Sequence, residues 1–271
     1  METTLGSTVR YYLESEMDQA DLIDVAGGHF VAFSRTCPEK DEPNDDSAVI
    51  IHTSGGAVVL AVADGVGGAP LGYKASAIAV QCLAETLLDH DDDRDLRPAI
   101  LDGIERANAE ILDMGTGAAT TICVVEINHR RVARGYQVGD SMALIVGQRG
   151  AIKWKSVSHS PVGYAIESGL IDEMDAMHHD ERHLVSNLVG SREMHIEIGP
   201  AIALAARDTI VVGSDGLFDN LHLSEVTALA RVGRPLDRID ALVKLATERM
   251  QQHDADAPGK PDDLALLLMT P

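Results

Sequence analysis

The residues from 58 to 68 constrain this fold most, because an apolar run there ends at one carboxylate and a glycine-rich turn. Residues 58–63 read Val-Val-Leu-Ala-Val-Ala, and Asp64 and Gly65 follow directly. Such a run predicts a strand covered on both faces, since a half-exposed strand would alternate apolar and polar residues. Gly65 lacks a Cβ atom, so its backbone can approach a ligand closely and offer its carbonyl to a hard cation. A strand that simply runs into a glycine turn explains these residues equally well.

The same arrangement of a buried strand beside carboxylates recurs along the chain. Residues 209–213 are followed by Ser-Asp-Gly with Asp215, the acidic pair at 262–263 precedes the apolar residues 264–269, and the acidic residues at 44–46 lead into a further apolar run. Carboxylates brought together in a site of low dielectric constant repel one another unless cations neutralise them. If these strand ends converge, the sequence therefore predicts bound metal.

In this order, the motifs resemble those of the PPM, or type 2C, family of metal-dependent serine/threonine protein phosphatases, in its bacterial form. The matching residues are Asn44-Asp45-Asp46-Ser47, Asp64-Gly65-Val66-Gly67-Gly68, Gly117-Ala118-Ala119-Thr120-Thr121, Gly139-Asp140-Ser141, Ser214-Asp215-Gly216-Leu217-Phe218-Asp219-Asn220 and Asp262-Asp263-Leu264. An isolated Asp-Gly pair is a common turn. Six motifs in the family's order are far more specific, and together they span nearly the whole chain.

The resemblance implies an α+β fold, a four-layer αββα sandwich of two antiparallel sheets flanked by helix pairs, with the metals in a cleft at one end. The residue pattern supports this class independently, because helices are expected in pairs between blocks of strands that short turns connect. We expect residues 1–271 to form a single domain, with residues 159–193 as a flap-like insertion beside the cleft.

Residues 1–27 are expected to form a short strand or a loosely held arm. The expected helices cover residues 75–88, a segment from Pro98 through Ile111, and residues 223–230 and 236–250. The other expected strands cover residues 29–34, 120–127, 132–138, 142–146, 151–156 and 194–198.

The resemblance also implies the residues of the site and their roles. Asp64, Asp215 and Asp262 would be catalytic, with Asp64 bridging two Mn²⁺ or Mg²⁺ ions and the Gly65 carbonyl supporting one of them. Asp215 and Asp262 would hold the other ion. Asp45 and Asp46 match the acidic pair that completes its shell, and Asp140 matches a residue that recruits a third, weaker ion. The implied reaction is hydrolysis of phosphoserine or phosphothreonine in a protein substrate by a metal-activated water.

Three departures from the family pattern concern the substrate and the leaving group. The family often has an arginine for the substrate phosphate at position 40 or 41, where this chain has Lys40 and Asp41. Lys40 or the more distant Arg35 is expected to substitute weakly, because lysine lacks the bidentate fork of arginine. Val66 stands where eukaryotic members carry a histidine proposed as general acid, and Met142 stands where the family often has arginine.

Composition excludes some partners and suggests a compartment. The formal net charge of -21 argues against binding to nucleic acid and to anionic membranes, since both need clustered lysine and arginine. Three widely spaced cysteines, Cys37, Cys82 and Cys123, favour a reducing compartment and core packing over a disulfide framework. No apolar run approaches the roughly 18 residues of a membrane span. With no signal-like N-terminus, a cytoplasmic protein is expected.

Two other functions stay open at this point. The first is a catalytically weak phosphatase-like fold that acts as a phosphoprotein-binding or regulatory subunit, and the missing arginine is its support. The second is another two-metal hydrolase, such as a nuclease or a small-molecule phosphatase. The acidity of the chain and its lack of a basic groove argue against a nuclease. Residues 178–183 are rich in histidine, and they are expected to be exposed, with metal binding by His179 and His183 on one helical face as the alternative. Trp154 is expected to serve in packing.

Overall fold

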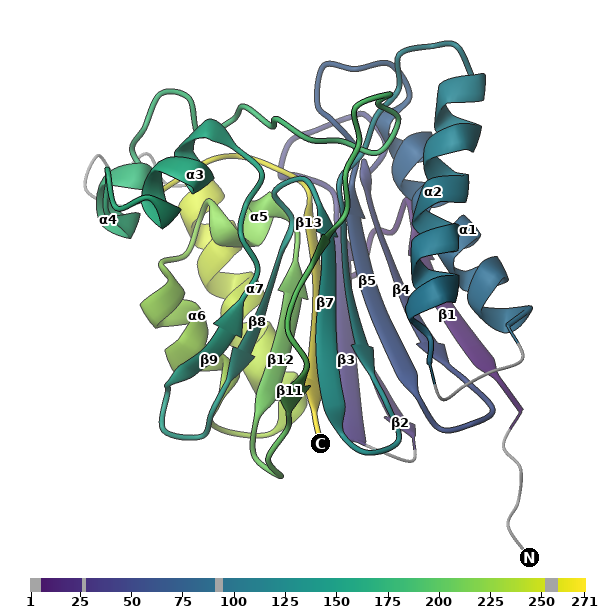
Figure 1. Cartoon of the computed structure of the whole chain (residues 1–271). Coiled ribbons are helices and arrows are strands. Elements are labelled where there is room, and N and C mark those ends of the chain that lie inside the picture. The colour runs from purple at the N-terminus through teal and green to yellow at the C-terminus, as the bar shows by residue number, and fades with distance from the viewer. Residues whose placement is uncertain (1–5, 26–27, 91–94, 252–257) are drawn as a thin grey trace, which may run out of the picture.

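The computed structural model describes residues 6–25, 28–90, 95–251 and 258–271. Two antiparallel sheets pack face to face, and helices cover the outer face of each sheet (Figure 1). This arrangement confirms the expected α+β sandwich of four layers.

The first sheet contains the strand that ends at Asp64. Its order is β1-β4-β5-β6-β7-β10, with β11 also paired to β7. The bounds are β1 (Thr8–Leu13), β4 (Asp46–His52), β5 (Val58–Asp64), β6 (Ile122–Ile127), β7 (Val132–Val138), β10 (Glu197–Ile198) and β11 (Ile202–Ala203). Every residue of β5 before Asp64 is buried, as the apolar run predicts.

The second sheet has the order β2-β3-β13-β12-β8-β9. Its bounds are β2 (Asp21–Val25), β3 (Gly28–Arg35), β13 (Leu264–Thr270), β12 (Thr209–Gly213), β8 (Met142–Val146) and β9 (Ile152–Lys155). The central strands β12 and β13 are almost wholly buried, because one face meets the first sheet and the other meets helices. Sequence-distant strands are thus neighbours at the centre of this sheet.

Helices α1 (Gly72–Leu88) and α2 (Arg97–Asp113) cover the first sheet, while α5 (Asp215–Phe218), α6 (Leu223–Ala230) and α7 (Pro235–Gln251) cover the second (Figure 1). Strand β5 is apolar throughout because its alternate residues face two different hydrophobic clusters. Val59 and Ala61 pack toward the first helix pair, whereas Leu60 and Val62 pack between the sheets.

Most of the expected elements are confirmed, and the differences lie at edges. Residues 8–13 and 21–25 form strands at sheet edges, so the described part of the N-terminal segment is not a loose arm. Of the strand expected at 194–198, only Glu197–Ile198 pairs with β7. Trp154 packs as predicted, because a Cβ atom at Gly135 would lie 2.1 Å from its ring.

Residues 159–193 hold two short helices, α3 (Pro161–Glu167) and α4 (Glu173–Ala176), which lie beside α5 at one end of the sandwich (Figure 1). His178, His179 and His183 are exposed, as expected. They follow α4 in turns, so the prediction of a shared helical face for His179 and His183 is wrong. Polar turn residues without an apolar stripe do not sustain a helix here.

Among the helices that the structure describes, none is both long enough and apolar enough to span a bilayer.

Candidate functional site

The ends of four strands bring the predicted carboxylates to one end of the sandwich. Strand β4 begins at Asp46 and β5 ends at Asp64, and their antiparallel register places these two residues opposite each other. In the second sheet, Asp215 follows β12 by two residues, and the pair at 262–263 directly precedes β13. The Ser214 hydroxyl donates a 2.6 Å hydrogen bond to Asp46 Oδ2 and so joins the two sheets. The convergence that the sequence left as a condition is therefore present.

The backbone of Asp64 is held by the two threonines that precede β6. Asp64 N donates to Thr121 Oγ1 at 3.0 Å, and Thr121 N donates to Asp64 O at 2.8 Å. The Thr120 hydroxyl donates to the same carbonyl at 2.7 Å. Thr121 Oγ1 also lies 2.7 Å from Ser141 Oγ, beside Asp140. These bonds explain why a Thr-Thr pair and a Gly-Asp-Ser turn accompany the acidic strand end.

Gly65 has a packing reason to be glycine. A Cβ atom there would lie 2.4 Å from the backbone carbonyl carbon and oxygen of Gly72, the first residue of α1. Gly65 N donates to Asp45 O at 3.0 Å, so the turn also holds the acidic pair before β4. Close approach of α1 therefore requires this glycine, in addition to any role of its carbonyl toward a cation.

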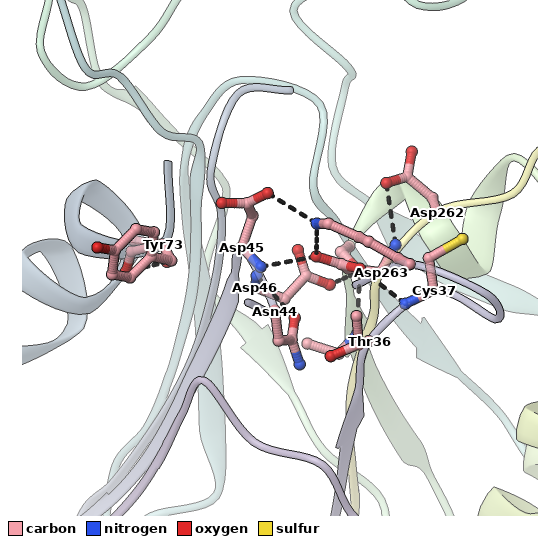
Figure 2. A network of polar contacts seen from close by, with 12 residues as sticks. Thr36, Cys37, Asn44, Asp45, Asp46, Tyr73, Asp262 and Asp263 are labelled. Carbon is pink, nitrogen blue, oxygen red and sulfur yellow. Dashed lines mark hydrogen bonds and ion pairs between the residues drawn. The ribbon is translucent and has the colours of Figure 1, made fainter. Parts of the chain in front are cut away.

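Asp263 organises the residues around the start of β4. Its carboxylate is buried and accepts hydrogen bonds from Cys37 N at 2.7 Å, from Asp45 N at 2.6 Å and from Lys40 Nζ at 2.6 Å. In Figure 2, the Asp263 side chain points toward Asp45, whereas the Asp262 carboxylate lies farther from Asp45 and accepts a 3.0 Å hydrogen bond from Asp263 N. Asp263 thus holds the chain in place, and the adjacent Asp262 faces a different group of carboxylates.

The two cations expected at the substrate phosphate are both ion-paired. Lys40 Nζ lies 2.8 Å from Asp45 Oδ2 in addition to its contact with Asp263. Arg35 is bound by Glu16 at 2.9 Å and by Asp18 at 2.6 Å. A substrate phosphate would have to compete with these carboxylates for either side chain.

A second group of carboxylates surrounds the ammonium of Lys260. Its Nζ pairs with Asp215, lies 2.9 Å from Asp262 Oδ2 and lies 3.1 Å from Asp219 Oδ2. Among the described residues, Asp215 Oδ1 is buried without a hydrogen-bond partner. Asp219 lies within one of the family-like motifs but was not among the predicted site residues. Its spacing of four residues from Asp215 was the available signal, because it places both on one helical face.

Burial and mutual repulsion raise the pKa of the clustered carboxyl groups. Burial is the largest cause for Asp46, Asp64 and Asp140, whose pKa values lie well above the ordinary range. The charge of Asp215 raises the pKa of each of them further. Burial and Asp215 likewise raise the pKa of Asp219 to about 6 and that of Asp262 to about 7, although Lys260 opposes both shifts. The cluster therefore holds less negative charge than its composition suggests unless a cation neutralises it.

These shifts predict that the metal-free protein loses stability as the pH rises. The pKa of Asp262 is about 7 in the folded protein against 3.8 for an ordinary aspartate, so between these values the folded state binds more protons than the unfolded state. The free energy of unfolding in chelator should therefore fall from about pH 5 to about pH 7. Urea unfolding across this range measures it, and Asp262→Asn should show a smaller slope. A free energy of unfolding that rises steadily over the same interval would contradict the shifts.

The donor set suits a hard divalent cation. Calcium, magnesium and manganese prefer carboxylate and carbonyl oxygens, which are the groups gathered here. The unpartnered Asp215 Oδ1 and the raised pKa values both indicate an uncompensated demand for positive charge. In the described part of the chain, however, no group of three or more His, Cys, Asp or Glu side chains is already arranged to hold a metal ion. Lys40 and Lys260 instead lie between the carboxylates and draw them toward ammonium groups.

His159 joins the 159–193 segment to the turn that carries Asp140. Its buried Nδ1 accepts a 3.1 Å hydrogen bond from Gly139 N, so the proton of the neutral ring lies on Nε2, which is 3.1 Å from Glu197 Oε2. His159 N also donates to Gly139 O at 2.9 Å. Burial lowers the pKa of His159, which favours this neutral form. His159 was not among the predicted site residues.

Arg182 is a further basic residue that sequence reasoning missed. It lies in a turn after α4, and its charge lowers the pKa of Asp219 against the larger effect of burial. Its guanidinium donates to the carbonyl oxygens of Met177 and, at 3.4 Å, Gly259. Within the described residues it has no ion pair with a carboxylate. The segment from 159 to 193 thus supplies a cation beside the acidic cluster.

The chain is similar in sequence and in structure to known protein phosphatases. The model of the protein phosphatase 2C family matches residues 35–253, a range that ends before Asp262. The protein phosphatase PhpP of Streptococcus pneumoniae is 26% identical over 218 residues, which cover 77% of this chain and 87% of PhpP. The serine/threonine phosphatase of S. agalactiae has a similar structure, with a TM-score of 0.76 and 24% identity over 89% of this chain and 98% of that one. The catalytic domain of the phosphatase PstP, in complex with two manganese ions, has a TM-score of 0.70 and 21% identity over 89% of this chain and 96% of that one.

Proposed function

The chain belongs to the protein phosphatase 2C family and is a metal-dependent serine/threonine protein phosphatase, and we propose that its converging strand-end carboxylates hold two divalent cations for this reaction. The observation that carries the proposal is the approach of Asp46, Asp64, Asp215 and Asp262 from both sheets. Manganese or magnesium fits this set of oxygen donors.

The proposed ligands divide between the two sheets. Asp64 would be shared by both cation sites, with the Gly65 carbonyl supporting one of them, while Asp215 and Asp262 would hold the other. Asp46, supported by Asp45, would complete the set of ligands from the first sheet. We propose that Asp140 and Asp219 would recruit a third, weaker cation, because both line the same cavity as Asp215.

When bound, two divalent cations lower the pKa of an attacking water and neutralise the oxygens of the phosphate. The protein's own groups position these ligands. The Ser214 hydroxyl orients Asp46, and the hydrogen bonds of Thr120 and Thr121 hold the backbone of Asp64 in place. Such supporting bonds limit the movement of a ligand and so favour one coordination geometry.

The phosphate of the substrate needs a cationic partner from the chain. Lys40 and Arg35 are weak candidates, because both are held by carboxylates. We add Arg182, whose guanidinium has no carboxylate partner in the described part of the chain and lies beside Asp219. Arginine binds phosphate through two parallel hydrogen bonds, which lysine cannot form.

Hydrolysis of a phosphothreonine peptide is expected to require added manganese or magnesium and to stop on chelation. The reason is that the proposed site uses carboxylate-bound cations rather than a cysteine or serine nucleophile. The measurement is phosphate release from the peptide with manganese, with EDTA, and with EDTA followed by excess manganese. Inhibitors of the okadaic acid type should have no effect.

The same assay separates the alternatives. Full turnover in excess EDTA, in buffers verified to be free of metal, would rule out the proposed mechanism. Peptide binding without phosphate release would favour the regulatory subunit, and metal-dependent cleavage of DNA would favour a nuclease. We further propose a cytoplasmic location, to which the three unpaired cysteines are suited.

A further inference from the structure

A cavity of about 310 Å³ opens beside the carboxylates, between the 159–193 segment and the helices that follow β12. Asp140, Asp215 and Asp219 form part of its lining. Its volume lies at the low end of the range for ligand cavities, roughly 300 to 1,000 Å³. This space is therefore continuous with the proposed catalytic centre and is large enough for one or two side chains.

The walls away from the carboxylates are mainly apolar. The apolar side chains come from both sides of the cavity: Val162, Ile166, Met174, Met177, Phe218 and Leu223. Met174 is 59% exposed although it faces this cavity. Exposed apolar groups that gather in a hollow are stabilised when a ligand covers them, and methionine adapts its shape to different partners.

The polar groups at the cavity suit an extended peptide rather than a second charged ligand. Lys155 is neutralised by Glu173 at 2.6 Å and by Glu167 at 3.7 Å. Arg182 carries no carboxylate partner among the described residues and lies on the side of Asp219. Of the lysine and arginine side chains that line the cavity in the described part of the chain, only Arg182 lacks a carboxylate partner, and it lies next to the carboxylates. The remainder of the cavity is therefore suited to an apolar group.

We propose that this cavity binds a large apolar side chain of the substrate, within two residues of the phosphoserine or phosphothreonine. Consecutive residues of an extended chain are roughly 3.3 to 3.6 Å apart, so a phosphoresidue at the carboxylates places its near neighbours at the cavity. The inference rests on the proposed function, and it adds that substrates are phosphoproteins with leucine, methionine or phenylalanine beside the modified residue.

The test compares phosphothreonine peptides that carry either leucine or glycine at one of the two positions on each side of the phosphoresidue. For the wild type, leucine at one or more of these positions is expected to raise kcat/KM at least about tenfold over glycine, a typical effect of filling an apolar pocket. Ile166→Trp fills the cavity from α3, and it should reduce this ratio to about threefold or less. Met174→Trp fills the cavity from α4 and should reduce the ratio in the same way, so the test does not depend on the folding of Ile166→Trp alone.

Leu170→Trp is the matched control, because Leu170 lies in the same segment, is 79% exposed and does not line the cavity. It should leave the leucine-to-glycine ratio unchanged. p-Nitrophenyl phosphate has no neighbouring residue, so its hydrolysis reports on the catalytic centre alone. No hydrolysis of either substrate by the wild type would overturn the proposed function itself. Two other outcomes would overturn the cavity proposal only. One is that the wild type hydrolyses all peptides equally, and the other is that the cavity variants lose peptide and p-nitrophenyl phosphate turnover in parallel.

Discussion

Replacing Asp64 with asparagine is expected to lower phosphatase activity at least about a hundredfold and to remove most of the stabilisation by manganese. Loss of a group that only supports a metal ligand typically costs 10- to 100-fold, so loss of the proposed bridging ligand should cost more. For the wild type, manganese at about one hundred times its dissociation constant should add roughly 2.7 kcal/mol to the free energy of unfolding per independent site. In a chain of this size that raises the melting temperature by about 5 to 10 °C.

The metal-free variant should be at least as stable as the metal-free wild type. Burial and the charges of Asp215 and Asp46 raise the pKa of Asp64, so its carboxylate is unfavourable there without a cation. Asparagine removes that charge while keeping the size of the side chain. Thermal melts of both proteins in chelator and in millimolar manganese measure the two effects together.

Asp208→Asn is the matched control, because Asp208 is a buried aspartate with a structural role. It is 2% exposed, pairs with Lys153 and accepts a 2.7 Å hydrogen bond from Ala205 N. This variant should lower the melting temperature in chelator and keep the response to manganese. If Asp64→Asn behaved like Asp208→Asn, Asp64 would be a structural residue and the proposed metal centre would lose its central ligand.

The fold was predictable where one periodicity dominates a segment. The apolar runs of β5 and β13 and the helical spacing of Ile100, Ile104 and Ile111 in α2 arise from burial, which leaves a direct trace in sequence. The edge strands were harder. β1 and β2 have mixed exposure, because only one side of each pairs and packs, so their pattern resembles a polar arm.

The acidic residues of the site could be predicted from the sequence, whereas its basic residues could not. Asp64 and Asp215 lie at strand ends that the apolar runs identify, so they converge once the two sheets pack face to face. Lys260 precedes Asp262 by two residues, and nothing in that spacing shows that its ammonium would reach Asp215 as well. Arg182 lies 77 residues before Gly259, to whose carbonyl it donates, so this contact depends on the tertiary fold.

The position of Lys260 leads to the second prediction with a large effect. Its ammonium lies among Asp215, Asp219 and Asp262, where a divalent cation would also be most strongly attracted. Burial lowers the pKa of Lys260, but the three carboxylates outweigh this effect and raise the pKa above its ordinary value. The charged lysine therefore acts as an internal cation that a metal must displace.

Replacing Lys260 with methionine should have opposite effects on stability and on metal affinity. Without metal, three partly buried carboxylates lose their counter-charge, which should cost on the order of 2 kcal/mol. That corresponds to a fall in melting temperature of about 4 to 8 °C. Manganese should bind about tenfold more tightly, because the ion no longer competes with the ammonium. The difference in melting temperature from the wild type should therefore narrow or vanish in saturating manganese.

Lys153→Met separates this competition from the general loss of an ion pair. Lys153 pairs with Asp208 at the opposite end of β12 from Asp215, and its side chain is 34% exposed. The control should lose some stability in chelator while keeping the manganese affinity of the wild type. Calorimetric titration of manganese into both variants and the wild type gives the affinities directly, and melts in chelator give the stabilities. If Lys260→Met bound manganese no more tightly than the wild type, the ammonium would not occupy the place of a metal, and the carboxylates would bind their cations elsewhere in the cluster.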